Sequence, residues 1–171
     1  MIQHVLARLV GLGDETLVTS NNPDALEFLD LPLVSDEDPG AGALYGLRTA
    51  LRAARGDRVL IVACDMPFVN RLLLEHLIVL SANADVVVPR WNDRYQTMQS
   101  VYARKKCLKA VEAALEQGER RMISFYPQVK VRIVSSEEVA EYDPTGRSFF
   151  NVNTPEDLAE AERLLAKARG K

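Results

Sequence analysis

The stretch RVLIVACDMP, residues 58–67, decides the fold of this chain. Its first part, Arg58–Ala63, is apolar after the arginine, which predicts a strand buried on both faces, as in the centre of a parallel sheet. Asp65 follows this strand, and Met66-Pro67 closes it. In open α/β sheets, ligands bind beyond the carboxyl ends of the strands. Asp65 is therefore the first candidate functional residue.

Strands and helices alternate on both sides of this stretch. Period-two patterns and apolar runs predict further strands over residues 15–20, 33–34, 85–88, 97–103 and 129–134. Helical spacing predicts helices over residues 1–10, 23–30, 43–54, 70–83, 106–117 and 121–126, and a last helix from Pro155. This alternation predicts a three-layer α/β fold, with a mostly parallel sheet and helices on both faces.

Length and composition narrow the functional class. The 171 residues predict one domain, spanning 1–171, and the 47% hydrophobic content predicts a folded chain. Lys and Arg number 21 against 24 Asp and Glu, so a chain-wide basic footprint for nucleic acid is absent. We find neither a run of about 20 apolar residues nor a signal-peptide pattern, and therefore expect a cytoplasmic protein with no membrane partner. Cys64 and Cys107 are too few for a disulfide framework, and we expect both to stay reduced.

Asp65 has the chemistry of a metal ligand. A carboxylate fixed at the end of a buried strand is a hard oxygen donor, and Mg²⁺ prefers one or two carboxylates together with substrate phosphates. The competing structural role is to cap the helix that starts near Asn70, but five residues separate the two positions, which is too far for an N-cap. We therefore interpret Asp65 as a magnesium ligand.

Two further motifs follow predicted strands. The turn after Ser35 contains Asp36 and three glycines, which let the backbone approach a ligand, although turns of this composition are commonly only turns. Asn151 and Asn153 flank a valine at a strand end, so their amides point the same way and can meet one ligand. The following Thr154-Pro155 is a helix start, which does not explain both asparagines.

Taken together, these motifs resemble one family. The segments VACDMPF, DPGAGALYGL and FFNVNTPEDLAEAE are similar to those of molybdenum cofactor guanylyltransferases, and the resemblance is collinear from Ile2 to the last helix. It implies a Rossmann-like nucleotidyltransferase fold. It also implies transfer of GMP from GTP to the phosphate of molybdopterin, with Mg²⁺ as the cofactor and pyrophosphate as the product.

The resemblance assigns roles to individual residues. Asp65 matches the catalytic, metal-binding aspartate, which also contacts the nucleotide. Asp36 and Asn21 match positions that bind the guanine nucleotide, and Asn151 and Asn153 match the paired asparagines on the substrate side.

One part of the family pattern is absent. The family begins with a strand and a Gly-rich signature close to Leu-Ala-Gly-Gly, and this chain starts after it, so we expect a nucleotidyltransferase-like domain that is incomplete at its N-terminus. The missing strand predicts a gap in the sheet between residues 15–20 and 58–63. We therefore expect the chain to be poorly stable, to self-associate or bind a protein partner, or to rearrange so that these two strands pair directly.

Other functions fit the sequence less well. A pterin cytidylyltransferase, a sugar-phosphate nucleotidyltransferase and a non-catalytic truncated remnant remain open alternatives. A phosphoacceptor receiver domain is excluded, because Asp65 is adjacent to Met66 and the strand over residues 15–20 ends in Thr-Ser-Asn-Asn rather than in an acidic pair.

Overall fold

The structure is a computed structural model and describes residues 1–35, 40 and 42–169. Its helices are α1 (Ile2–Leu9), α2 (Ala43–Ala53), α3 (Arg71–Leu80), α4 (Arg104–Glu116), α5 (Ser136–Ala140) and α6 (Pro155–Arg169). Its strands are β1 (Val18–Ser20), β2 (Leu33–Ser35), β3 (Arg58–Val62), β4 (Val86–Trp91), β5 (Arg94–Tyr95), β6 (Gln99–Ala103) and β7 (Val131–Val134). The 3₁₀ turns are η1 (Asp24–Leu29), η2 (Ser81–Asn83), η3 (Tyr126–Gln128) and η4 (Arg147–Phe149).

The predicted α/β architecture is confirmed, and the main sheet is mixed rather than mostly parallel. Five strands form it, in the order β3-β6-β4-β5, and β7 pairs with β4. β4 and β7 are parallel, whereas β6 runs antiparallel to both β3 and β4. We predicted one solvated face for β6, but all five of its residues are buried, because it lies between two strands and under helices on both sides.

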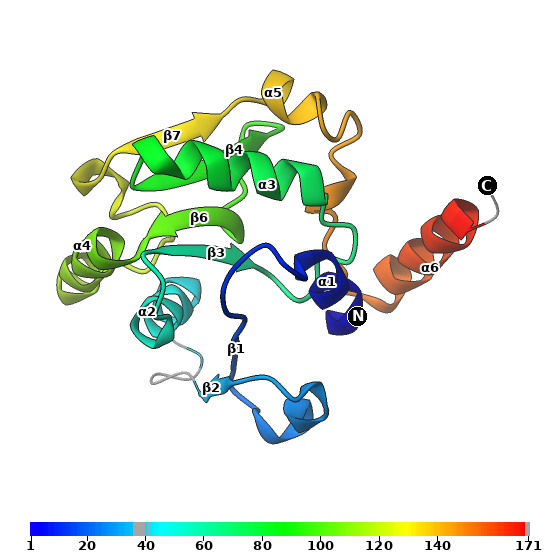
Figure 1. Ribbon diagram of the computed structural model, residues 1–171, viewed down its shortest axis with the longest axis horizontal. Coiled ribbons are helices and arrows are strands. Elements are labelled where there is room, and N and C mark those ends of the chain that lie inside the picture. Colours follow the sequence, from blue (N-terminus) through cyan, green and yellow to red (C-terminus); the bar gives the residue numbers. More distant parts are fainter. Residues whose placement is uncertain (36–39, 41, 170–171) are drawn as a thin grey trace.

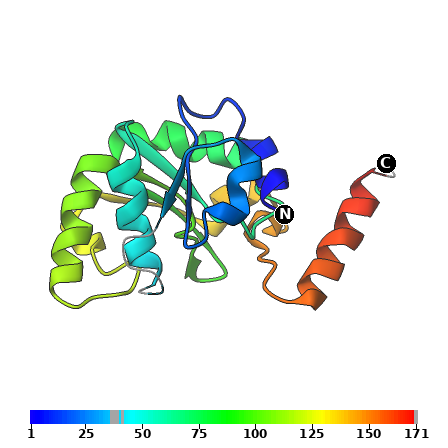
Figure 2. The same cartoon turned by 90° about the horizontal axis from the view of Figure 1, so that it is seen from below.

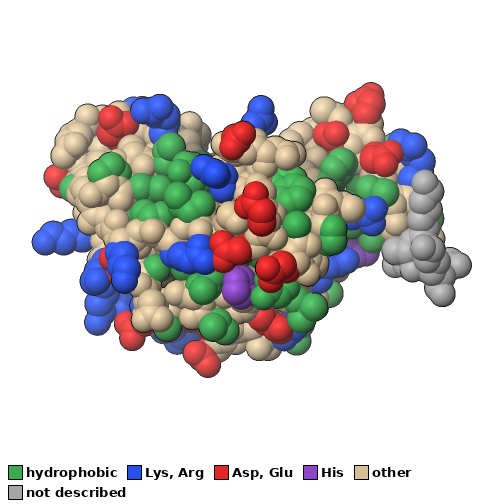
Figure 3. Space-filling model, turned by 90° about the horizontal axis from the view of Figure 1, so that it is seen from above, with side chains coloured by type: hydrophobic (Ala, Val, Ile, Leu, Met, Phe, Trp, Pro, Cys, Tyr) green, Lys and Arg blue, Asp and Glu red, His purple; other side chains and the backbone are tan. Residues whose placement is uncertain are grey.

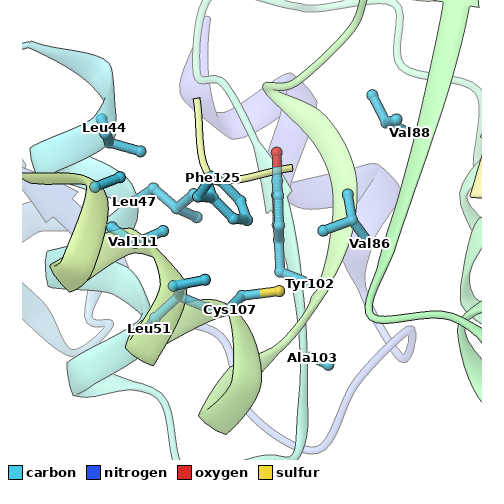
Figure 4. Close-up of a cluster of buried hydrophobic side chains, with 12 residues drawn as sticks. Leu44, Leu47, Leu51, Val86, Val88, Tyr102, Ala103, Cys107, Val111 and Phe125 are labelled. Carbon is cyan, nitrogen blue, oxygen red and sulfur yellow. The ribbon is translucent and has the colours of Figure 1, made fainter. Parts of the chain in front are cut away.

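Helices cover both faces of this sheet, as predicted (Figure 1). On one face, α2 and α4 pack on Tyr102, Val86 and Val88, together with Phe125 (Figure 4). On the other face, α1, α3 and α5 pack on Val87 and Val101. Both layers are apolar, and burial of this kind stabilises a fold by roughly 25 cal/mol per Å² of apolar surface.

The predicted gap between residues 15–20 and 58–63 is present. Among the residues that the structure describes, β1 pairs only with β2, in a separate two-stranded sheet, and β3 is an edge strand of the main sheet, so β1 and β3 do not pair directly. Val59–Val62 are apolar yet only half-buried for this reason. The strand predicted from Glu15 begins only at Val18, since the Glu15 carboxylate turns to accept hydrogen bonds from the backbone and side-chain nitrogens of Arg55, at 2.6 and 2.8 Å.

The outer surface has two further features. α6 extends away from the body of the molecule, on the side opposite α4 (Figures 1 and 2). On the face shown in Figure 3, acidic and basic side chains are interspersed with hydrophobic ones. No helix in the described ranges is both long and apolar enough to cross a bilayer.

Candidate active site

Asp65 occupies the turn that follows β3 and is half-buried. One of its carboxylate oxygens, Oδ1, is buried and has no hydrogen-bond partner among the described residues. An unpaired buried oxygen costs free energy, so such a group in a folded protein calls for a bound water, an ion or a catalytic role. The Asp65 carboxylate therefore has an open position for a ligand.

The asparagine segment lies directly beside this carboxylate. The Val152 N–H donates a hydrogen bond of 2.9 Å to the backbone carbonyl of Asp65. This bond joins the end of β3 to residues 151–153, which are distant in sequence. Asn151 and Asn153 are both exposed and flank the tethered Val152. The structure thus brings together three of the five predicted site residues.

The start of α6 holds the asparagine segment from its other side. The Asp157 carboxylate accepts from the backbone N–H groups of Asn153 and Thr154, at 3.0 and 2.9 Å, and the Thr154 hydroxyl accepts from Asp157 N–H. The hydrogen bond from Asn153 N–H, followed by those from Thr154, lowers the pKa of Asp157. The predicted helix cap is confirmed, and it orients the segment that carries both asparagines.

The structure does not place the remaining two predicted residues, Asn21 and Asp36, beside Asp65. Asn21 follows β1 and is exposed, but β1 belongs to the separate two-stranded sheet. Asp36 lies outside the described residues. Their roles in nucleotide binding therefore stay predictions.

A cavity of about 690 Å³ lies beside the asparagine segment. Its aromatic lining consists of Trp91, Phe149 and Phe150, and Arg94 and Gln96 add polar groups. Phe150 also contacts Phe68, at 5.9 Å between ring centroids, so the cavity adjoins the chain that leaves Asp65. Its volume is in the usual range for small-molecule sites.

The sequence does not predict this cavity, because residues 90–94 have the composition of a polar loop. In the structure β4 continues to Trp91, and Asn92 and Asp93 form a tight turn into β5, both with positive φ. Adjacent Asn and Asp between two strands are a known signal for such hairpins. That signal could have located the hairpin, but not the loop from Asp143 to Phe149 that packs on it.

Asp143 holds that loop in place. The residue is 7% exposed, and its carboxylate accepts from Ser148 N–H at 2.7 Å, from the Ser148 hydroxyl at 2.5 Å and from the Thr145 hydroxyl at 3.0 Å. Burial alone would raise the pKa of Asp143, but these hydrogen bonds outweigh burial and lower the pKa below its usual value. An ionised Asp143 therefore fixes one wall of the cavity.

Neither cysteine forms part of a nucleophilic site. Cys64 and Cys107 are both free. Desolvation raises the pKa of the Cys64 thiol, and the adjacent Asp65 charge adds to this effect. Burial raises the pKa of Cys107 to about 12. Both groups are thus thiols rather than reactive thiolates at neutral pH.

Comparison with known proteins identifies the family. The family described as the MobA-like NTP transferase domain matches residues 1–131. A probable molybdenum cofactor guanylyltransferase of Pelotomaculum thermopropionicum is 35% identical over 99% of this chain and 82% of its own length. The chain belongs to this family. A molybdenum cofactor guanylyltransferase of Desulfosudis oleivorans is 30% identical, over 99% of this chain and 84% of its own.

Solved structures agree with the family assignment. Molybdopterin-guanine dinucleotide biosynthesis protein A of Archaeoglobus fulgidus has a TM-score of 0.79 and 28% identity, over 97% of this chain and 85% of its own. A 4-diphosphocytidyl-2C-methyl-D-erythritol synthase of Anaerococcus prevotii has a TM-score of 0.74 at 15% identity, over 96% and 85%. That second likeness shows a shared fold only. The predicted family, nucleotidyltransferase fold and enzyme class are therefore confirmed.

Proposed function

We propose that this chain transfers GMP from GTP to the phosphate of molybdopterin, with Mg²⁺ bound at Asp65. The buried Oδ1 of Asp65, which has no hydrogen-bond partner in the described part of the chain, is the observation that carries this proposal. No cluster of three or more His, Cys, Asp or Glu suited to a metal was found in the described ranges. A single carboxylate that shares a cation with substrate phosphates fits the preference of Mg²⁺.

The reaction follows from positioning rather than from covalent catalysis. The acceptor phosphate attacks the α-phosphorus of GTP in line, and pyrophosphate leaves from the opposite side. A bound Mg²⁺ offsets the negative charge that gathers on the phosphates. Asp65 holds that ion, and the amides of Asn151 and Asn153 orient the phosphate groups beside it. Neither His4 nor His76 is needed as a base.

The cavity beside the asparagine segment fits the acceptor. Trp91 and Phe149 lie tilted toward one another, at 6.2 Å between ring centroids, and offer apolar faces to a planar ring system. Arg94 supplies a cation for an anionic substituent. We assign the pterin to this cavity and the guanine nucleotide to the side of Asn21.

Replacement of Asp65 tests the proposal. Asp65→Asn keeps the shape of the side chain but removes the charged ligand, and should lower Mg²⁺-dependent GMP transfer by at least roughly 100-fold. The control is Asp57→Asn, at the other end of the same strand, which should retain full transfer. Circular dichroism should show the same fold for both variants. Turnover of Asp65→Asn within a few-fold of the unmodified protein would exclude the metal role, and CTP used as readily as GTP would contradict the guanylyl assignment.

A further inference from the structure

A second hollow, of about 370 Å³, lies between the end of α1, the start of α3 and the loop after Asp143. Three arginines from three different elements line it: Arg8 of α1, Arg71 of α3 and Arg147 of η4. Neither the sequence motifs nor the proposed transfer reaction assigns a role to this hollow. It shares Thr145 and Arg147 with the aromatic cavity.

The charge of the three arginines is only partly neutralised. Arg71 forms an ion pair with Glu75 at 2.9 Å, and its Nη1 also donates to the Val10 carbonyl at 2.6 Å. Arg8 donates to the backbone carbonyl of His4, and this carbonyl carries no charge that could neutralise the arginine. In the described part of the chain, the guanidinium groups of Arg8 and Arg147 form no ion pair with a carboxylate. The hollow therefore stays positive even with Glu75 and Asp143 counted.

The side chains of Asn70 and Thr145, which also line the hollow, are already hydrogen-bonded. The Asn70 amide donates to the Tyr142 carbonyl at 2.8 Å, and its oxygen caps the start of α3 by accepting from Leu73 N–H. The Thr145 hydroxyl donates to Asp143. The guanidinium nitrogens that these bonds do not use, which include Nη2 of Arg71 and Nη2 of Arg8, are thus side-chain donors left for a ligand. The planar guanidinium group matches the oxygens of phosphate.

We propose that this hollow is a binding site for a phosphate-type oxyanion, held by Arg8, Arg71 and Arg147. An anion bound there would fix Arg147, and with it the loop that forms one wall of the aromatic cavity. This inference does not depend on the identity of the nucleotide or acceptor in the transfer reaction.

Trp91 provides the measurement. It is the only tryptophan of the chain, and Gly146, next to Arg147, lies directly against its indole. Inorganic phosphate, titrated into the full chain at constant ionic strength, should change the Trp91 emission in a saturable way, while chloride should not. Calorimetry in parallel gives the affinity without reliance on the fluorophore.

Variants separate this site from the proposed transfer site. Arg8→Gln and Arg147→Gln should each weaken phosphate binding by at least roughly tenfold, because each removes a charge-assisted donor pair. Lys109→Gln, which removes an exposed charge on α4, is the matched control and should bind as the unmodified protein does. Asp65→Asn should also retain phosphate binding, whatever its effect on GMP transfer.

Several outcomes would overturn the proposal. These are the absence of saturable binding, unchanged affinity in Arg8→Gln, loss of affinity in Asp65→Asn but not in Arg8→Gln, and equal binding of succinate. Melting temperatures establish that the variants fold. Pyrophosphate, titrated in the same way, distinguishes a monophosphate from a diphosphate as the preferred source of the oxyanion, and tight binding of either supports the site.

Discussion

Gly146 shows how one residue without a side chain shapes the aromatic cavity. It has a φ of +64°, and a Cβ at this position would lie 2.1 Å from Nε1 of Trp91. We expect Gly146→Ala to lower the free energy of unfolding by more than about 1 kcal/mol, since strain at positive φ and a collision with the indole add together. Denaturant unfolding measures this loss. Gly118→Ala is the control, with a φ of +79° and no atom within 4 Å of the added Cβ. An equal loss in both variants would show that the indole contact contributes nothing.

Asp143, a second single residue, predicts that the free energy of unfolding depends on pH. Its pKa in the folded protein is lowered, so its ionised form stabilises the fold above the unfolded pKa of about 3.9, and this contribution is lost as pH falls through the folded pKa. Asp143→Asn should therefore lower the free energy of unfolding at neutral pH by roughly 1–3 kcal/mol. The difference between the two proteins should shrink in acid. A difference that stays constant with pH would contradict the role of the ionised carboxylate.

The cap of α6 acts at the scale of an element. Much of this helix is exposed, so its first turn depends on the mutual hydrogen bonds of Thr154 and Asp157. Thr154→Ala should destabilise the helix start by about 1 kcal/mol and speed amide exchange in its first turn. Thr154→Ser keeps the hydroxyl and should exchange as the unmodified protein does. If the alanine variant exchanges no faster, another interaction holds the helix start and the asparagine segment before it.

The open edge of β3 affects how the whole molecule exchanges its amide protons and associates. The N–H of Ala63 donates to Met98 O at 3.0 Å, so the amides of Val59 and Ile61 also point toward β6, and those of Leu60 and Val62 point to the unpaired edge. Amide exchange measured by NMR in dilute solution should therefore alternate along β3, with Leu60 and Val62 exchanging fastest. β4 lies inside the sheet, and its residues Val86 and Val87 should be protected without alternation.

The same edge leads to an expectation for association. The open edge of an apolar strand is a template for pairing with another chain. Protection of Leu60 and Val62 should increase with protein concentration, together with the sedimentation coefficient. Uniform protection along β3 at the lowest concentration, in a monomeric sample, would show that the edge is covered within the chain.

The sequence by itself determined the local elements and the first part of the site. The apolar run from Arg58 predicted β3, and Thr154-Pro155 predicted the start of α6, because strand burial, helix caps and turn residues act over a few neighbouring positions. Asp65 was found in the same way, as a polar residue at the end of a strand. Asn151 and Asn153 were found on a wrong premise, because they follow the 3₁₀ turn η4 and not the predicted strand.

Only the tertiary structure decided how the strands pair and which distant residues meet. The antiparallel placement of β6, the contact of Gly146 with Trp91 and the convergence of Arg8, Arg71 and Arg147 join segments far apart in the sequence. Residue patterns do not predict such contacts. The periodicity of a strand is the same whether it pairs parallel or antiparallel, and the sequence does not distinguish one surface arginine from another. These long-range contacts become visible only when the two helical layers close on the sheet and fix the loops between them.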